Sequence, residues 1–217
     1  MELPELRRLV SRGEDLHLEF KRKANHPDKL AREVVAFANT EGGLLLIGVD
    51  DDSTIYGIKF PEEDRYVLDT YLHQHCTPDL GFRWFKVRVN ERRSVLGLEV
   101  DPSDDRPHFL FDHERDRKMA FVRVRDMSVR ASREMVQLMR LQRRQRGGHL
   151  SFGEYEQQLL QHLEERPTIT LPETQQLLQL NKRRTSSMLI RLVNAGLLRI
   201  QPTEKGDYFS LREEAFG

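Results

Sequence analysis

A short acidic stretch near the N-terminus holds the residues whose types and spacing could do chemistry. Glu14 precedes Glu19 by five residues, and Lys21 follows Glu19 at the second position. This acid-x-lysine form is found in many metal-dependent nucleases, where the carboxylate binds a hard divalent cation and the lysine neutralises a phosphate. Asp50 and Asp51 follow the apolar run LLLIGV, and one of them could complete a cluster of three carboxylates. The spacing alone is a weak signal, because a half-buried strand with a solvent-exposed polar face, followed by a plain turn at the two aspartates, is the more common explanation of such residues.

The hydrophobic pattern indicates which elements must position these groups. Residues 16–22 alternate, which predicts a strand with His17, Glu19 and Lys21 on one face. Residues 26–40 predict a helix that stops at the glycine pair 42–43, and residues 44–49 predict a strand buried on both faces. The stretch TIYGIKF is predicted to return as the hairpin partner of that strand.

Helices and short strands continue to about residue 143, which predicts an α+β domain with a mixed sheet and flanking helices. The remaining helices are predicted at 2–11, 62–75 and 132–143, and the remaining strands at 82–90, 94–100, 108–111 and 119–124. Composition changes at an arginine-rich stretch that ends in Gly147 and Gly148. We therefore predict a first domain at 1–145, a linker at 146–150 and a second domain at 151–217.

The hydrophobic pattern of the second domain predicts helices followed by two strands. Ser151 with Glu154, and Thr170 with Glu173, form capping-box patterns at the starts of two helices. A third helix follows Asn181, and the segments LLRI and DYFSL read as strands around a polar turn. Three helices and a two-stranded wing within about 65 residues predict a winged helix-turn-helix.

The start of the third helix is the predicted nucleic-acid contact. In this fold the third helix enters the major groove with its N-terminus first. Residues 181–191 contain four basic residues and no acidic one, although the rest of the domain is acidic enough to cancel that charge. A solvated basic face or a protein-docking role would leave the same pattern. The predicted contacts are Lys182, Arg183, Arg184, Thr185, Ser186 and Arg191.

Several stretches taken together resemble one family. EDLHLEFKR, REVVAFANTEGGLLLIGVDDD, IYGIKF, RPHFLF and AFVRVRDMSVRAS follow each other as in the AlbA-like (AlbA_2) domain of the Schlafen family, over about residues 1–140. That domain is also met under the names divergent AAA domain and ATP-binding domain. The resemblance implies a Schlafen/AlbA-like sheet, and small bacterial members commonly carry a C-terminal helix-turn-helix.

The resemblance also implies site residues. Ribonuclease members of the family cut RNA with a divalent metal, Mg²⁺ or Mn²⁺, held by three carboxylates, and the matching positions here are Glu14, Glu19 and Asp51, with Lys21 as an electrostatic helper. No ATP is expected, because the chain lacks the G-x-x-x-x-G-K-[ST] phosphate loop. Full Schlafen cores resemble two such lobes joined together, so a homodimer is expected of a single lobe.

Composition limits the remaining choices. Lys and Arg number 35 and Asp and Glu number 35, so any argument for nucleic acid must be local. A single cysteine, Cys76, excludes a disulfide framework and suits a reducing cytosol. The N-terminus is too charged for a signal peptide, and no apolar run is long enough for a membrane span. A cytoplasmic location is therefore expected.

Three function classes follow from these patterns. The main prediction is a nucleic-acid-binding protein with duplex DNA, structured RNA or both as its partner, acting as a DNA-binding transcriptional regulator or a defence-associated factor. The alternative is a metal-dependent endoribonuclease that uses the three carboxylates. A protein-interaction module, with the winged helix serving assembly, is a further alternative.

Overall fold

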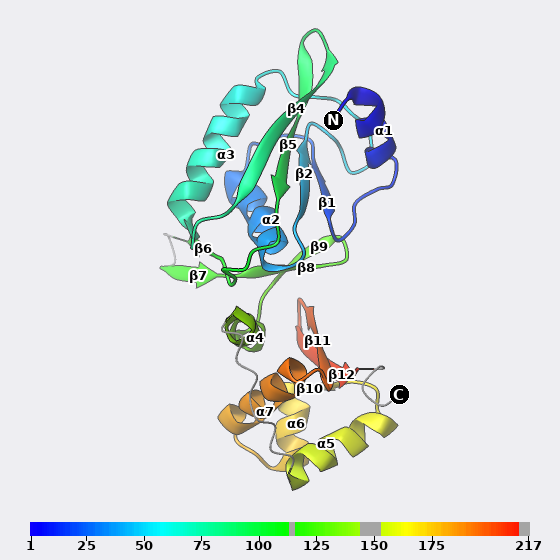
Figure 1. The fold of residues 1–217 in the computed structure, drawn as a ribbon, viewed down its shortest axis with the longest axis vertical. Coiled ribbons are helices and arrows are strands. Elements are labelled where there is room, and N and C mark those ends of the chain that lie inside the picture. The colour runs from blue at the N-terminus through cyan, green and yellow to red at the C-terminus, as the bar shows by residue number, and fades with distance from the viewer. Residues whose placement is uncertain (113–115, 144–152, 213–217) are drawn as a thin grey trace. The chain divides into compact units, whose positions relative to one another are not determined.

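The chain forms two compact units in a computed structural model that describes residues 1–112, 116–143 and 153–212 (Figure 1). Unit 1 spans Met1–Val129 and unit 2 spans Arg130–Gly217. The division precedes the predicted domain boundary because helix α4 (Arg133–Arg143) packs against helix α7 (Lys182–Asn194) of unit 2. The predicted linker, 146–150, lies outside the described residues.

Unit 1 is built on a mixed sheet with the strand order β1-β2-β5-β4. Strand β1 runs parallel to β2, and helix α2 (Pro27–Asn39) makes the crossover between them. Strand β2 is antiparallel to β5, which pairs with β4 as a hairpin. The strands span β1 Leu18–Lys21, β2 Gly43–Ile47, β4 Phe82–Asn90 and β5 Arg93–Val100.

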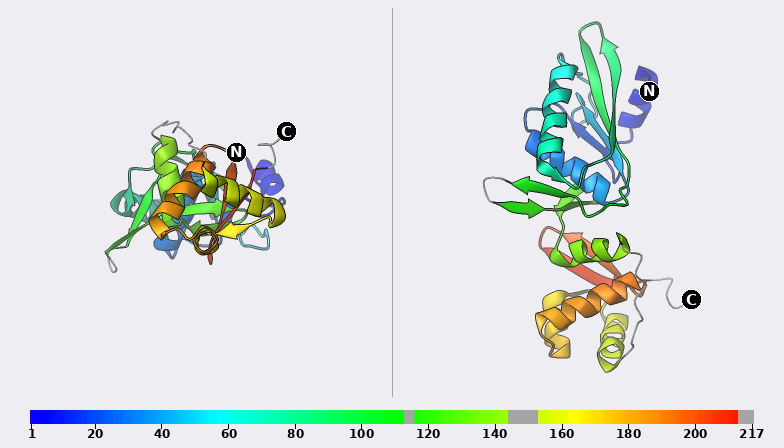
Figure 2. Two further views of the ribbon diagram at one scale, coloured as in Figure 1. Left: turned by 90° about the horizontal axis from the view of Figure 1, so that it is seen from below. Right: turned by 60° about the vertical axis from the view of Figure 1, so that its left-hand side comes forward.

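Helices cover both faces of this sheet (Figures 1 and 2). Helices α2 and α3 (Pro61–His75) share an apolar core with residues such as Leu45 and Leu98 of the sheet. Helix α1 (Leu3–Val10) packs on the opposite face, against Phe20 and its neighbours. The alternation predicted along β1 is therefore confirmed, since its apolar side chains face α1.

Short strands complete unit 1 beside α2. Strands β3 (Cys76–Thr77), β6 (Phe109–Asp112) and β7 (Arg117–Met119) form a three-stranded sheet. Strands β8 (Phe121–Val124) and β9 (Met127–Arg130) form a separate pair, and β8 packs against α2. The single strand predicted over 119–124 is thus divided between β7 and β8.

The hairpin predicted after β2 is wrong. The stretch 54–60 makes only isolated bridges, Val49 to Ile55 and Ile58 to Ser94. Both edges of β2 are already occupied, by β1 on one side and β5 on the other. The segment therefore has no strand to pair with and forms a connecting loop to α3.

In the described part of unit 2, four helices pack with a small antiparallel sheet. The helices besides α4 are α5 (Glu154–Glu165), α6 (Leu171–Leu178) and α7, and the strand order is β10-β12-β11. The predicted cap at Thr170 is present, since its hydroxyl accepts from the Glu173 amide. Ser151 lies outside the described residues, and α5 begins instead after Gly153. The strands span β10 Ile169–Thr170, β11 Leu198–Thr203 and β12 Gly206–Leu211.

A core separate from those of unit 1 holds these elements together. Buried leucines of α5, α6 and α7 meet Ile169 and Phe209 from the sheet. Ser132 caps α4 by accepting from the Met135 amide at 2.9 Å, and it donates to Asp207 of β12. Among the described helices, none combines the length and the apolar composition that crossing a membrane requires.

Candidate functional site

Strand β1 places its acidic residue in the interior, not in solvent. Glu19 is only 5% exposed, on the sheet face that α2 covers. The predicted solvent-exposed polar face is therefore wrong at this position. The side chain of Arg123 on β8 covers Glu19, although the two residues are 104 positions apart in the sequence.

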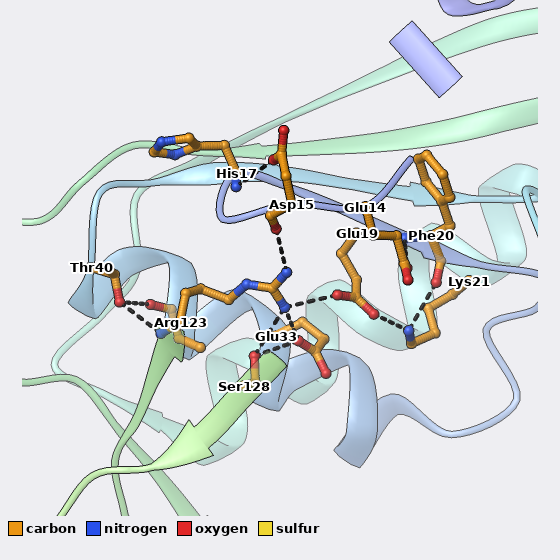
Figure 3. A network of polar contacts seen from close by, with 11 residues as sticks. Glu14, Asp15, His17, Glu19, Phe20, Lys21, Glu33, Thr40, Arg123 and Ser128 are labelled. Atoms are coloured by element: carbon orange, nitrogen blue, oxygen red, sulfur yellow. Dashed lines mark hydrogen bonds and ion pairs between the residues drawn. The ribbon is translucent and has the colours of Figure 1, made fainter. Parts of the chain in front are cut away.

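Arg123 is the centre of this network (Figure 3). Its fully buried guanidinium donates from one nitrogen to Glu19 and to Glu33 of α2, each at 2.8 Å. The other terminal nitrogen donates to the Asp15 carbonyl at 2.7 Å. Two carboxylates thus share one internal cation, which offsets part of the cost of burying them.

The end of α2 positions Arg123. Thr40 accepts from the Arg123 backbone amide at 2.9 Å and donates to a carbonyl one turn back in the helix. The buried amide of Asn39 donates to the carbonyls of His108 and Phe121, at 2.9 and 3.0 Å. The Asn-Thr pair of the AFANTEGG block therefore ties β6 and β8 to the helix.

Lys21 supplies the second cation of the network. Its ammonium donates to Glu19 and to the carbonyl of Phe20. Burial lowers the pKa of Lys21, but the hydrogen bond to Glu19 and the charges of nearby carboxylates outweigh this, so its pKa is raised. Lys21 stays protonated and is paired internally with Glu19.

Burial in this region also raises the pKa of two other carboxyl groups. Burial raises the pKa of Glu33, and the charge of Glu19 adds to the effect. Burial also raises the pKa of Glu14, whose carboxylate accepts from the Phe20 amide at 2.7 Å. The charges of Glu19 and Asp51 raise the pKa of Glu14 further.

The predicted ligands do not form a cation site as the side chains lie. One oxygen of Glu19 accepts from Lys21 and the other from Arg123. Asp51 is exposed, on the loop after β2. Across residues 1–112, 116–143 and 153–212, no group of three or more His, Cys, Asp or Glu side chains could hold a metal ion. The metal-dependent ribonuclease activity stays a prediction, without support from this arrangement.

Sequence reasoning did not assign Glu33 or the ion pairs of Arg123. Both residues lie on elements that were predicted, yet local periodicity does not tell which buried charge meets which. A usable signal was the alternation in AFVRVR, which places Arg123 on the opposite face of the strand from Val122 and Val124.

The start of α7 presents the second predicted site. Asn181 caps the helix, accepting from the Arg184 amide at 3.0 Å. Lys182, Arg183 and Arg184 are exposed and make no ion pair with any residue the structure describes. Arg191 is half-exposed and pairs with Glu156 of α5 at 3.2 Å.

Two predicted contacts of α7 are buried. Thr185 is 0% exposed and donates to the Asn181 carbonyl. Ser186 is 8% exposed and donates to Glu134 of α4 at 2.7 Å. Both therefore belong to the packing of α7 and not to its exposed surface; Ser187, between Ser186 and Met188, is exposed instead.

A groove of about 810 Å³ lies along the packed helices α4 and α7 within unit 2. Among the described residues that line it, the one acidic residue is Glu134, which accepts a hydrogen bond from Ser186. Cationic side chains come from both walls: Arg133 and Arg140 from α4, and Lys182, Arg183 and Arg191 from α7. The groove therefore favours an anionic partner.

Comparison with known proteins identifies part of the chain. The family model described as "Schlafen, AlbA_2" matches residues 14–132, more than half of the 217 residues. No curated protein matches the chain.

Two solved structures are similar to parts of it. One is the crystal structure of the DIP2311 protein from Corynebacterium diphtheriae, with 23% identity, a TM-score of 0.41, and coverage of 61% of this chain and 28% of that one. The other is a solution NMR structure of the N-terminal domain of a protein from Nitrosomonas europaea described as related to the ATP-dependent DNA helicase RecG. It shows 22% identity, a TM-score of 0.38, and coverage of 52% and 78%. The chain thus spans little more than a quarter of the DIP2311 protein.

Proposed function

The chain belongs to the Schlafen, AlbA_2 family, and on that premise we propose that it is a nucleic-acid-binding protein whose unit 2 docks on duplex DNA. A role as a transcriptional regulator or a defence-associated factor is the form of this function that we favour. The observation that carries the proposal is the run Lys182–Arg184 at the capped N-terminus of α7, which is exposed and forms no ion pair with the residues that the structure describes.

The order of elements in unit 2 supports a winged helix-turn-helix. Helices α6 and α7 are joined by a three-residue turn, 179–181, with Gln179 in the left-handed region at φ 52°. Strands β11 and β12 pair in register from Leu198 with Leu211 to Thr203 with Gly206, which forms a two-stranded wing. In such domains the helix after the turn enters the major groove.

The charges at α7 support contact with the phosphate backbone first. Basic side chains release counterions when they neutralise phosphates, which makes binding steeply salt-dependent. The cations of α4 that line the groove beside α7 extend the same basic surface. The two buried hydroxyls of α7 are not part of this interface, so base readout is assigned to exposed residues such as Ser187.

A homodimer is part of the proposal. A two-fold axis would present two α7 helices to paired half-sites about one turn of DNA apart. Sedimentation velocity on the purified chain measures this directly, and a monomer at every concentration would remove the dimer while leaving single-site docking intact.

Fluorescence anisotropy with a labelled duplex of random sequence tests the docking. The double variant Lys182→Ala/Arg183→Ala should weaken binding and reduce the slope of log K against log salt by about 2, since each lost phosphate contact removes about one unit. The variant Arg7→Ala/Arg8→Ala removes the same charge from exposed positions of α1 and should bind like the wild type. Equal behaviour of the two variants would refute the assignment.

A further inference from the structure

A second basic surface lies in unit 1, away from the network of Arg123. A pocket of about 510 Å³ opens between the segment after β1, the loop before α3, the first turn of α3 and the start of β5. Its volume falls in the range of about 300–1,000 Å³ that is usual for ligand sites.

The topology of the sheet makes this an expected place for a ligand. Strands β1 and β2 are parallel neighbours joined by α2. Ligands of open α/β sheets bind outside the carboxyl ends of such strands. The pocket residues 22–25 directly follow β1, and the pocket residues 56–60 come from the loop that follows β2.

Exposed aromatic rings line the pocket. Tyr56 is 40% exposed and Phe60 is 63% exposed. The guanidinium of Arg22 lies 4.3 Å from the centre of the Tyr56 ring, and Asp50 holds it there at 3.1 Å. Arg22 thus contacts one face of the Tyr56 ring, and the ring remains partly exposed to solvent. This arrangement is suited to stacking a planar base.

Cations surround these rings. Lys23 and Lys59 are exposed and have no hydrogen-bond or ion-pair partner in the described part of the chain. Arg93 donates to the Gly57 carbonyl at 2.9 Å and keeps its remaining donors. Two free ammonium groups beside exposed rings fit the phosphates that flank a stacked base.

The pocket also contains polar groups that can meet the edge of a base. Asn25 is exposed, and Asp64 lies on the first turn of α3 beside Glu63. These acids accept hydrogen bonds and would favour exocyclic amino groups over a second phosphate. Since Arg22 is paired with Asp50, three cations (Lys23, Lys59 and Arg93) stand against these two acids, and the pocket still favours an anion overall.

We infer that this pocket binds an unpaired nucleotide within a single-stranded nucleic acid, with Tyr56 and Phe60 stacking the base and Lys23 and Lys59 contacting its phosphates. The inference extends the proposed nucleic-acid role to unit 1, but it rests on residues that duplex docking by α7 does not use. Each can therefore fail without the other.

Anisotropy of the full chain with labelled ten-nucleotide oligo(U) and oligo(dT) tests the pocket. Tyr56→Ala should weaken binding about 5- to 140-fold, the equivalent of losing one base–aromatic stack. Tyr56→Phe should retain wild-type affinity because it keeps the ring.

Lys23→Ala/Lys59→Ala should lower the slope of log K against log salt by about 1 to 2. Free UMP as competitor distinguishes a mononucleotide site from a strand site, since only the former is blocked at micromolar concentration.

Matched controls separate this inference from duplex docking. Tyr66→Ala removes a tyrosine that is 73% exposed on α3 outside the pocket, and it should bind oligo(U) like the wild type. Lys182→Ala/Arg183→Ala should also keep oligo(U) binding. Wild-type affinity in Tyr56→Ala, equal losses in Tyr56→Ala and Tyr66→Ala, or blockage by free UMP would overturn the inference.

Discussion

At the scale of residues, an internal arginine pairs with the carboxylates of the acidic region and so determines which of them are available to a ligand. Arg123 and Lys21 together occupy both oxygens of Glu19, and Arg123 also pairs with Glu33. A further cation at Glu19 would therefore have to compete with two protein cations that are already in place. As the side chains lie, the acidic stretch is part of a structural network. The exposed cations elsewhere in the chain are therefore the stronger candidates for function.

Removing the internal arginine should be costly. Arg123→Met leaves the buried Glu19 and the partly buried Glu33 without their shared cation, and we expect a loss of about 3–5 kcal/mol in the free energy of unfolding. Urea unfolding followed by circular dichroism measures it. Arg83→Met, at a surface arginine that is 61% exposed and paired with Asp101, should cost at most about 1 kcal/mol. Similar losses in the two variants would show that the buried network contributes little.

At the scale of elements, the glycine pair after α2 determines how the helix meets the sheet. Gly42 adopts φ +76°, where a side chain is disfavoured. A Cβ atom on Gly43 would lie 2.2 Å from the Phe37 ring. The pair therefore lets α2 end directly above β2, and this brings Asn39 to His108, just before β6, and Thr40 to Arg123 of β8.

A methyl group at this junction should be destabilising. Gly43→Ala forces the Phe37 ring or the strand to move, and we expect a loss of about 1–3 kcal/mol from overpacking. Gly81→Ala is the matched control, because its Cβ would meet nothing within 4 Å. Thermal unfolding of the two variants checks the contrast, and a stability for Gly43→Ala equal to that of Gly81→Ala would contradict it.

At the scale of the whole molecule, two units have separate cores. The residues that pack α2, α3 and α1 on the main sheet all belong to unit 1, and the core of α5, α6 and α7 belongs to unit 2. Helix α4 belongs with unit 2, because Glu134 bonds to Ser186 and Ser132 bonds to Asp207. Each unit thus has what an independent folding unit requires.

Residues 130–217 alone should fold and bind duplex DNA. We expect a single cooperative urea transition and a salt slope equal to that of the full chain, because the basic surface of α4 and α7 is complete within this unit. A fragment that begins at residue 151 lacks α4 and should be less stable. If the shorter fragment matched the longer one, α4 would not be part of the folded unit.

Local pattern determined much of this protein. Alternation along β1, the Thr170 cap and the glycine pair are short-range features, so the sequence alone predicted most helices, the main strands and the α+β class. The basic run at the start of α7 was also predicted, because charge at a helix end needs no tertiary partner to be recognised.

Tertiary structure decided the rest, because it depends on partners that are distant along the chain. The burial of Glu19, the pairing of Arg123 across 104 residues and the burial of Thr185 and Ser186 follow from which faces pack together. The segment 54–60 does not form the predicted strand beside β2, because β5 occupies that edge of β2. Periodicity tells which face of an element is apolar, and only the packed fold decides what each polar side chain meets.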